Sequence, residues 1–404
     1  MKLLVIEPRT LFPMDKGAKI LSGNVIAELA REHEVTVLVN VDPEEPSENT
    51  DQMRGLGCNV VPVAWREVPN FTARFYLELA RCLLTGQLYA VKKYCTAALK
   101  ERAEELARSG AFDVVVCDTI SASMPDVDFG PLPCVVISHN IEHRLRERQA
   151  ARAGGLKAAY LRHYARKTRK FEVRSYRAAD HVAAVSPVDA EFIRDDLGVA
   201  HVTALPPGVD TEYFSPQGAE SPWPEIVFTG SMDWQSNQDA VCFFAEQVLP
   251  SIRESVPDVR FTVVGRRPPP HITRLAEADP DHITVTGTVP DVRPYLARGW
   301  VAAVPVLFGS GIKIKVFEAM AMAKPVVVST IGAEGLPLTN GVDSFVVDGP
   351  KDMAAACVKL LSDKDLRNRI GDRARRTVLD GHDWAAVAAK LADICKSVTA
   401  GGRV

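Results

Sequence analysis

The chain has 404 residues, of which 47 % are hydrophobic and 25 % are charged, and its formal net charge is −3 at pH 7. This length predicts two or three domains, and the composition is that of an ordinary soluble globular protein. The near-balanced charge excludes a general attraction to nucleic acid or to anionic membranes. Because no stretch approaches about 18 uncharged apolar residues, we also expect no membrane-spanning helix.

The cysteines and the first residues bear on the cellular compartment. The eight cysteines are scattered without a C-x-x-C pair, and Cys117 and Cys134 fall in apolar runs, as reduced core residues do. Residues 1–8 lead directly into a strand and lack the layout of a signal peptide. We therefore expect a cytoplasmic protein.

Apolar runs alternate with helical patterns through the first half of the chain, and glycine-containing loops separate them. The expected strands are residues 2–7, 34–39, 59–64, 114–117, 134–137, 182–185 and 202–205. The segments expected to be helical are 18–31, most of 71–110, and 156–178. This alternation predicts a doubly wound α/β domain with a mainly parallel sheet.

A second alternating series follows a stretch rich in proline and other turn residues, 206–224. Its expected strands are 226–229, 260–264, 283–286, 301–306, 325–328 and 344–347, and its helical segments between 351 and 397 close the chain. We therefore expect one domain at 1–206, a second at 207–382, and a last helix at 383–404 that can pack back on the first domain.

The most informative stretch is 308–321, which lies between two apolar strands and predicts a βαβ unit. Gly309 and Gly311 permit a tight turn and a close approach of backbone to a ligand. The following helix offers unpaired N–H groups to an anion, and Lys313 in its first turn can reach the same anion. Glu318 lies seven residues after Gly311, which is about two helical turns, and its carboxylate suits the ribose hydroxyls of a bound nucleotide. The alternative is an ordinary crossover helix with solvated lysines, since neither a complete G-x-G-x-x-G nor a P-loop is present.

Two such domains predict a cleft between the carboxyl ends of their sheets, where ligands bind. The loop containing Gly17, the strand end at His139 and the turn at 309–313 all follow strands, so we expect them to line this cleft. Gly17 and His139 can each have a structural role instead of a role in ligand binding. Gly17 can be a simple turn residue, and a lone histidine is more often structural.

An acidic D-x-D sequence at 126–128 has the form of a metal motif. Pro125 precedes it and Gly130-Pro131 follow, so we interpret it as surface turn chemistry. No His/Cys cluster has the spacing of a metal site. We expect no metal and no other cofactor.

The segment from Arg144 to Arg177 is strongly basic, with twelve Lys and Arg residues against Glu147 and Glu172. Its apolar residues recur at spacings of four and seven, which predicts a helix with one apolar face. Two interpretations stay open. One is a core-packed helix with a solvated basic face, and the other is docking on an anionic membrane or on a lipid diphosphate acceptor.

Short motifs spread over nearly the whole chain resemble, in order and spacing, those of the nucleotide-sugar glycosyltransferases of the GT-B fold, in particular the retaining family 4 or group 1 type. They are D-K-G at 15–17, S-H-N at 138–140, V-S at 185–186, P-G-V-D at 207–210, F-T-G-S-M at 228–232, V-V-G at 263–265, G-T-V-P-D-V at 287–292, G-I-K at 311–313, E-A-M-A at 318–321 and P-V-V at 325–327. The resemblance implies two Rossmann-like domains facing a cleft. It also implies metal-independent transfer of a sugar from a nucleotide diphosphate to an acceptor hydroxyl, with retention.

The resemblance also implies roles for single residues. Glu318 would hold the ribose, the backbone of 287–289 would meet the base, and His139 would contact the donor sugar near its reacting carbon. The glycine loop at Gly17 would let backbone approach the donor and the acceptor. The donor-binding residues that we expect are Gly17, Gly230, Arg266, Val289, Ser310, Gly311, Ile312, Lys313 and Glu318, and the catalytic ones are His139 and Lys313.

The chain departs from the family pattern at two places. The family often has a second glutamate before the one at 318, with seven residues between the two. Here Ser310 stands at that position, and it can still hydrogen-bond the sugar or a phosphate. It also often has an arginine and a lysine after the first strand of the second domain, where this chain has Ser231, Met232 and Asn237. We expect the charge that holds the diphosphate to come from Lys313 instead, with Lys315 or Arg266 as helpers.

No carboxylate nucleophile stands out, so the expected task of the protein is to stabilise the departing diphosphate while an oxocarbenium-like sugar forms. The acceptor is a carbohydrate, a lipid-linked compound or a small molecule, in polysaccharide or glycoconjugate biosynthesis. The expected location is cytoplasmic or peripheral on the inner face of the membrane. Two alternatives remain. One is a nucleotide-sugar epimerase of the same fold. The other is a non-catalytic nucleotide-sugar binding subunit, because the Arg/Lys pair that would hold the diphosphate is missing.

Overall fold

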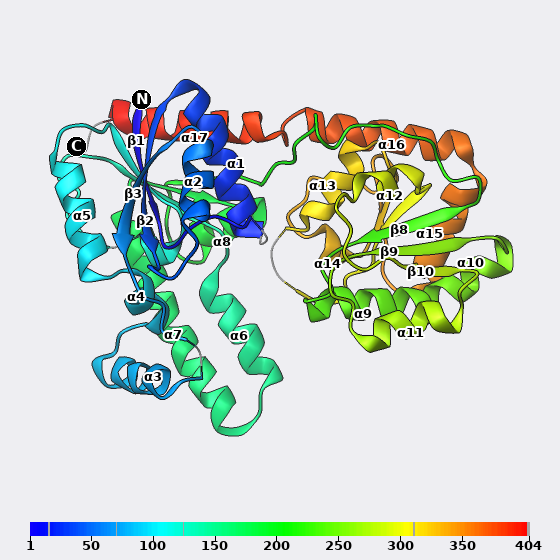
Figure 1. Ribbon diagram of the computed structural model, residues 1–404, viewed down its shortest axis with the longest axis horizontal. Coiled ribbons are helices and arrows are strands. Elements are labelled where there is room, and N and C mark those ends of the chain that lie inside the picture. Colours follow the sequence, from blue (N-terminus) through cyan, green and yellow to red (C-terminus); the bar gives the residue numbers. More distant parts are fainter. Residues whose placement is uncertain (15–16, 70, 124, 310–311, 402–404) are drawn as a thin grey trace. The chain divides into compact units, whose positions relative to one another are not determined.

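A computed structural model describes residues 1–14, 17–69, 71–123, 125–309 and 312–401. The chain divides into two compact units (Figure 1): unit 1 is Met1–Pro206 with Trp384–Val404, and unit 2 is Pro207–Asp383. Each unit has its own parallel sheet and its own hydrophobic core. The predicted fold class, two doubly wound α/β domains, is confirmed.

The sheet of unit 1 has seven parallel strands in the order β3-β2-β1-β4-β5-β6-β7. They are β1 (Lys2–Glu7), β2 (Glu34–Val41), β3 (Asn59–Ala64), β4 (Val114–Cys117), β5 (Cys134–Ser138), β6 (His181–Ala184) and β7 (Val202–Ala204). The order reverses between β1 and β4, and in open parallel sheets ligands bind beyond the strand ends at such a reversal.

Helices cover both faces of this sheet, because successive residues of each strand point to opposite faces. Leu3 and Val5 of β1 belong to the core under α1 and α17, which lie side by side, whereas Leu4 and Ile6 belong to the core under α5, α7 and α8. The helices are α1 (Gly17–Glu32), α2 (Ser47–Gly55), α3 (Ala73–Thr85), α4 (Tyr89–Tyr94), α5 (Ala97–Arg108), α6 (Glu142–Arg152), α7 (Gly155–Ala178), α8 (Pro187–Asp195) and α17 (Trp384–Gly401), with a 3₁₀ turn at Ile120–Ala122.

The helices α6 and α7 form a hairpin that one buried carboxylate holds together. Glu172 of α7 accepts hydrogen bonds from the backbone N–H groups of Glu142 (2.7 Å) and His143 (3.3 Å), and it also contacts the His143 ring. These are N–H groups in the first turn of α6, which have no partner within the helix. Most of the exposed residues of α7 are Lys and Arg. The basic side of this helix therefore faces water, and its apolar side packs on the protein.

The sheet of unit 2 has six parallel strands in the order β10-β9-β8-β11-β12-β13. They are β8 (Glu225–Thr229), β9 (Arg260–Val264), β10 (Ile283–Val285), β11 (Val301–Val304), β12 (Val326–Val328) and β13 (Phe345–Val346). The helices are α9 (Gln235–Phe243), which continues through a π-helical turn (Phe244–Val248) into α10 (Leu249–Ser255), then α11 (Pro270–Ala278), α12 (Arg293–Arg298), α13 (Ile314–Ala321), α14 (Thr330–Ala333), α15 (Pro350–Ser362) and α16 (Lys364–Leu379). The strand order reverses between β8 and β11, so the turns after these two strands form the expected ligand end.

Most boundaries lie within about two residues of the sequence-based expectation, and three differences bear on the helices and on the turn after β11. The helical stretch 71–110 is three helices, because Gly86 ends α3 with a left-handed φ of 75° and Thr96 caps a new helix. The strand expected to reach 306 ends at Val304, where Pro305 lacks the N–H that a continued ladder needs. The helix expected to include Lys313 begins at Ile314.

Candidate functional site

Two glycines hold the turns after β8 and β9 in close contact. A Cβ atom on Gly265 would lie 1.9 Å from the carbonyl oxygen of Gly230, a distance that no side chain can occupy. The two turns therefore pack backbone against backbone. Their place is the end of β8, where the strand order of unit 2 reverses.

Lys315 of α13 reaches this same point from the neighbouring βα crossover. Its Nζ would lie 2.4 Å from a Cβ atom on Gly230, so the ammonium occupies the space that the missing side chain leaves. It donates a hydrogen bond of 2.8 Å to Oδ1 of Asn237 and lies 4.2 Å from the centroid of the Phe228 ring. Asn237 is itself fixed, because its Nδ2 donates to the carbonyl oxygen of Ser231 over 2.7 Å.

Lys315 and Glu318 have pKa values that burial moves toward neutrality. Burial lowers the pKa of Lys315 to about 7, with Glu318 opposing this change and Lys313 adding to it. Burial also raises the pKa of Glu318 to about 7, and Lys315 opposes it. Three ionisable side chains thus influence one another at the start of α13, and perturbed groups of this kind concentrate at functional sites.

Lys313 lies immediately before α13, so its expected position inside the first turn is wrong. It is the N-cap residue, with φ −92° and ψ 84°. Its Nζ would lie 3.9 Å from a Cβ atom on Gly309, which has φ +139°, and the hydroxyl of Ser236 donates to the carbonyl oxygen of Phe308 over 2.8 Å. The ammonium of Lys313 therefore lies beside the glycine turn after β11. The expected donor residues Ser310 and Gly311 lie outside the described residues.

The other expected donor residues of unit 2 occupy varied positions. Arg266 follows β9, and its Nε donates to Ser231 Oγ (3.0 Å) and to Asp233 Oδ2 (3.1 Å). Because Arg266 is held in this ion pair with Asp233, Lys315 is better placed than Arg266 to assist Lys313 in binding a diphosphate. Ile312 and Val289 are half-buried and pack against the core of unit 2.

In unit 1, His139 follows β5 and pairs with a carboxylate that sequence reasoning missed. Its Nε2 lies 2.6 Å from Oδ1 of Asp118, which follows β4. Both lie near the strand-order reversal, where β1 ends with the buried Glu7. The available signal was an acidic residue at the end of one apolar strand, at position 7, and another directly after an apolar strand, at position 118. Gly17 is exposed and is the first residue of α1.

The pKa values of the two carboxyl groups in this cluster are shifted in opposite directions. Burial, together with the nearby Asp118, raises the pKa of Glu7 well above its usual value. Burial also acts to raise the pKa of Asp118, but His139 and hydrogen bonds from Glu7 and Ser22 outweigh it and lower the pKa to about 2. These shifts favour the protonated form of Glu7 and the ionised form of Asp118, and the Asp118 carboxylate orients the His139 ring.

The D-x-D sequence makes one surface ion pair and one turn hydrogen bond. Asp126 forms an exposed ion pair with Arg174, and Asp128 accepts a hydrogen bond of 2.9 Å from the N–H of Gly130. Within the residues that the structure describes, no group of three or more His, Cys, Asp and Glu side chains could hold a metal ion. In the same part of the chain, no helix is long and apolar enough to cross a bilayer.

Comparison with protein-family models gives two matches in chain order. Residues 17–213 match the model described as Glycosyltransferase Family 4, and residues 223–363 match the model described as Glycosyl transferases group 1. The two matches fall on unit 1 and on unit 2 respectively.

Curated relatives are similar over part or most of their length. The chain is 29 % identical over 220 residues to GDP-mannose-dependent alpha-(1-6)-phosphatidylinositol monomannoside mannosyltransferase of Mycobacterium tuberculosis, a match that covers 49 % of this chain and 56 % of that one. The chain thus spans about half the length of this relative. It is 26 % identical to MMP alpha-(1->4)-mannosyltransferase of Mycolicibacterium hassiacum, over 72 % of each chain.

Solved structures share the fold over nearly the whole chain. Sucrose-phosphate synthase from Thermosynechococcus elongatus superposes with a TM-score of 0.70 at 15 % identity and covers 100 % of both chains. HepE of Anabaena, determined in complex with UDP, superposes with a TM-score of 0.68 at 15 % identity, over 98 % of this chain and 100 % of that one.

Proposed function

Because the chain belongs to the group 1, family 4 glycosyltransferases of the GT-B fold, we propose that it transfers a sugar from a nucleotide diphosphate donor to an acceptor hydroxyl, with retention. The observation that carries the proposal is the set of Lys313, Lys315 and Glu318 at the glycine turns of unit 2. Two cations beside backbone turns suit a diphosphate, and a carboxylate further along the same helix suits ribose hydroxyls.

In this proposal Lys315 supplies the charge that the family often takes from an arginine and a lysine after the first strand of this domain. Asn237 stands in that region of the chain, and it holds the Lys315 ammonium at the end of β8. The cation therefore comes from α13 rather than from the segment after β8. Lys313 completes the pair from the turn after β11.

The proposed reaction breaks the bond between the anomeric carbon and the β-phosphate oxygen and forms a bond from the same carbon to the acceptor oxygen. The acceptor proton leaves on an oxygen of the departing nucleoside diphosphate. Negative charge grows on that diphosphate as the bond breaks, so Lys313 and Lys315 lower the barrier most if they bind it more tightly at that moment. His139, oriented by Asp118, is assigned to the sugar near the reacting carbon.

The proposal includes no metal, because the two lysines take the place of a divalent cation beside the phosphates. Activity should persist in EDTA. Loss of activity in EDTA and its return with Mg²⁺ or Mn²⁺ would overturn this part of the proposal.

The nucleotide can be identified by thermal shift with UDP, GDP, ADP and dTDP. A ligand at 100 times its Kd adds about 2.7 kcal/mol, which raises the melting temperature of a domain of this size by roughly 5–10 °C. We expect one or more of the four to stabilise the wild-type protein and to stabilise Glu318→Ala less. A flat response to all four at millimolar concentration would contradict the proposal.

The acceptor can be sought among carbohydrates, lipid-linked compounds and small hydroxyl compounds of polysaccharide or glycoconjugate biosynthesis. The names of two relatives contain a phosphatidylinositol mannoside and D-inositol 3-phosphate, so inositol-containing acceptors are the first to test. Product analysis then distinguishes the activities. A transferase forms a new glycoside only with an acceptor, an epimerase converts the donor alone, and a binding subunit does neither.

A further inference from the structure

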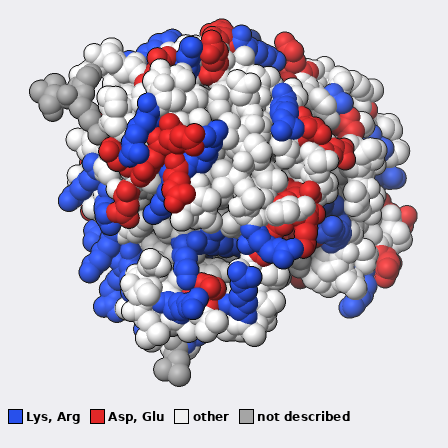
Figure 2. Space-filling model, turned by 60° about the vertical axis from the view of Figure 1, so that its left-hand side comes forward, with Lys and Arg blue, Asp and Glu red and all other residues white. Residues whose placement is uncertain are grey.

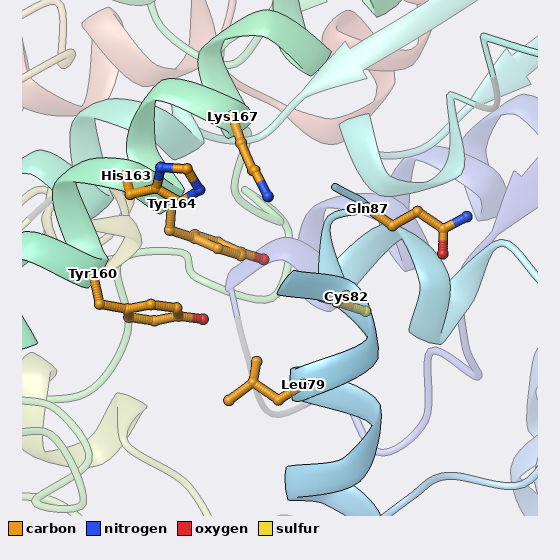
Figure 3. A pocket seen from close by; sticks show the side chains of 7 residues that line it. All are labelled: Leu79, Cys82, Gln87, Tyr160, His163, Tyr164 and Lys167. Atoms are coloured by element: carbon orange, nitrogen blue, oxygen red, sulfur yellow. The ribbon is translucent and has the colours of Figure 1, made fainter. Parts of the chain in front are cut away.

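The helix α3 has apolar residues on two faces, of which the protein covers one. The inner face carries Leu79 and Cys82, which line a hollow opposite Tyr160 and Tyr164 of α7 (Figure 3). Phe75 packs edge-on against Tyr89 with 5.3 Å between ring centroids. These contacts cover the apolar side of α3 that packs against the rest of unit 1.

The outer face of α3 and the turn before it are apolar as well, but they are exposed. The exposed fractions are 55 % for Tyr76, 57 % for Leu77 and 89 % for Leu84, and Phe71 just before the helix is 81 % exposed. A helix that is apolar on both sides is normally buried in a protein or in a membrane. Single exposed apolar residues are common on protein surfaces, but four large ones within 14 residues form a cluster, and such clusters mark interaction sites. We call these four residues the α3 apolar face.

Basic side chains border the α3 apolar face. Arg74 lies three residues before Leu77, and Arg81 lies four residues after it. These spacings place neighbouring side chains on one side of a helix, and both arginines are exposed. Figure 2 shows several Lys and Arg side chains, with a few acidic ones among them, on the lower part of one face. The chain as a whole has a net charge of −3, so this concentration of positive charge is local.

We propose that unit 1 docks on an anionic lipid bilayer through the α3 apolar face, with Arg74 and Arg81 in contact with the headgroups. Aromatic and leucine side chains beside arginines are the combination that binds the boundary between headgroups and acyl chains. A second copy of the chain is a poorer occupant, since a symmetric contact would bring the two basic borders together. This inference is independent of the proposed transfer reaction, and its test requires no activity.

The first test is sedimentation of the full chain with two kinds of vesicle, phosphatidylcholine alone and an equal mixture of phosphatidylcholine and phosphatidylglycerol. We expect binding to the mixed vesicles that weakens as salt is added. Arg74→Gln with Arg81→Gln should weaken it, and Leu77→Ser with Leu84→Ser should weaken it by roughly tenfold or more, because two apolar side chains no longer leave water. The matched control is Leu379→Ser, which changes a 46 % exposed leucine of unit 2 and should bind as the wild type does.

The second test reports insertion directly. In Leu84→Trp, bromine atoms on the acyl chains of mixed vesicles should quench the added fluorescence, and in Leu379→Trp they should not. Equal sedimentation with both vesicle types, unchanged binding of the double leucine variant, or absence of quenching at position 84 would each overturn the proposal. So would a dimer in solution that the double leucine variant dissociates, because the α3 apolar face would then cover a second copy.

Discussion

The ammonium of Lys315 and the side-chain oxygen of Asn237 lie 2.8 Å apart, although 78 positions separate the two residues. The contact places a cation from α13 at the end of β8, against the backbone of Gly230. Asn237 stands in the region where the family resemblance implies an arginine and a lysine, and this asparagine contacts the lysine that we propose takes their role. In this proposal the positive charge beside the diphosphate stays at the end of β8, but it comes from α13 and not from the segment after β8.

Loss of either lysine should slow the chemical step. Lys313→Ala and Lys315→Met each remove a cation that acts as charge grows on the diphosphate, and removing one such group typically lowers kcat by about 10²- to 10³-fold. Steady-state kinetics measures the effect. Lys359→Met serves as the control, because Lys359 also lies over an aromatic ring, that of Phe345 at 5.5 Å, but belongs to α15. A near-normal kcat for both variants would mean that the diphosphate is held elsewhere, with Arg266 the next residue to test.

Glu318 should matter for binding rather than for the chemical step. The ribose that it is proposed to hold does not change during the reaction, so Glu318→Ala should raise KM for the donor and leave kcat within a few-fold. Circular dichroism checks that the half-buried site still folds. An unchanged donor KM would show that the nucleotide does not lie along α13 in the proposed orientation.

Donor binding should take up a proton above neutral pH. The free protein has a Lys315 pKa of about 7, so at about pH 8.5 this lysine is mostly neutral and Glu318, also near 7, is mostly ionised. A diphosphate favours the charged ammonium and raises its pKa, so Kd should increase as pH rises above 7. Calorimetry at pH 8.5 in buffers of different ionisation enthalpy measures the uptake. Lys315→Met should abolish it, and uptake that persists in this variant would refute the assignment.

The two carboxyl groups near His139 should respond differently to amide substitution. Asp118→Asn removes the charge that orients the His139 ring and should lower kcat more than it changes donor KM. Burial raises the pKa of Glu7 well above its usual value and favours the neutral carboxyl group, which Glu7→Gln resembles, so this variant should have the smaller effect. Kinetics and thermal melting of both variants test the difference. Equal loss in the two variants would indicate that Glu7 carries a charge.

Gly265→Ala should destabilise unit 2. The new methyl group would meet the Gly230 carbonyl at 1.9 Å, and backbone cannot move aside as a flexible side chain can. Overpacking usually costs about 1–3 kcal/mol, and we expect at least that. Gly381→Ala is the control, because nothing lies within 4 Å of the added methyl. Chemical denaturation measures both, and equal stability would show that the two turns are farther apart.

The sequence by itself determined the elements and their order. Apolar runs, glycine turns and helical spacing are local patterns, and each element depends mainly on its own residues, so the two alternating series predicted two parallel sheets correctly. The motifs at 228–232, 287–292 and 318–321 identified the family for a related reason, since their spacing is a property of the linear chain. The same patterns indicated Glu318 and the glycine turn before it as a site.

The tertiary structure decided which side chains meet. Asp118 contacts His139 because β4 and β5 are neighbours in the sheet, and Lys315 contacts Asn237 because α13 follows the strand next to β8. It also decided that the outer side of α3 stays exposed, which periodicity could not show for a helix that is apolar on both faces. Contacts of this kind depend on strand order and on packing between distant segments, and local sequence patterns encode neither.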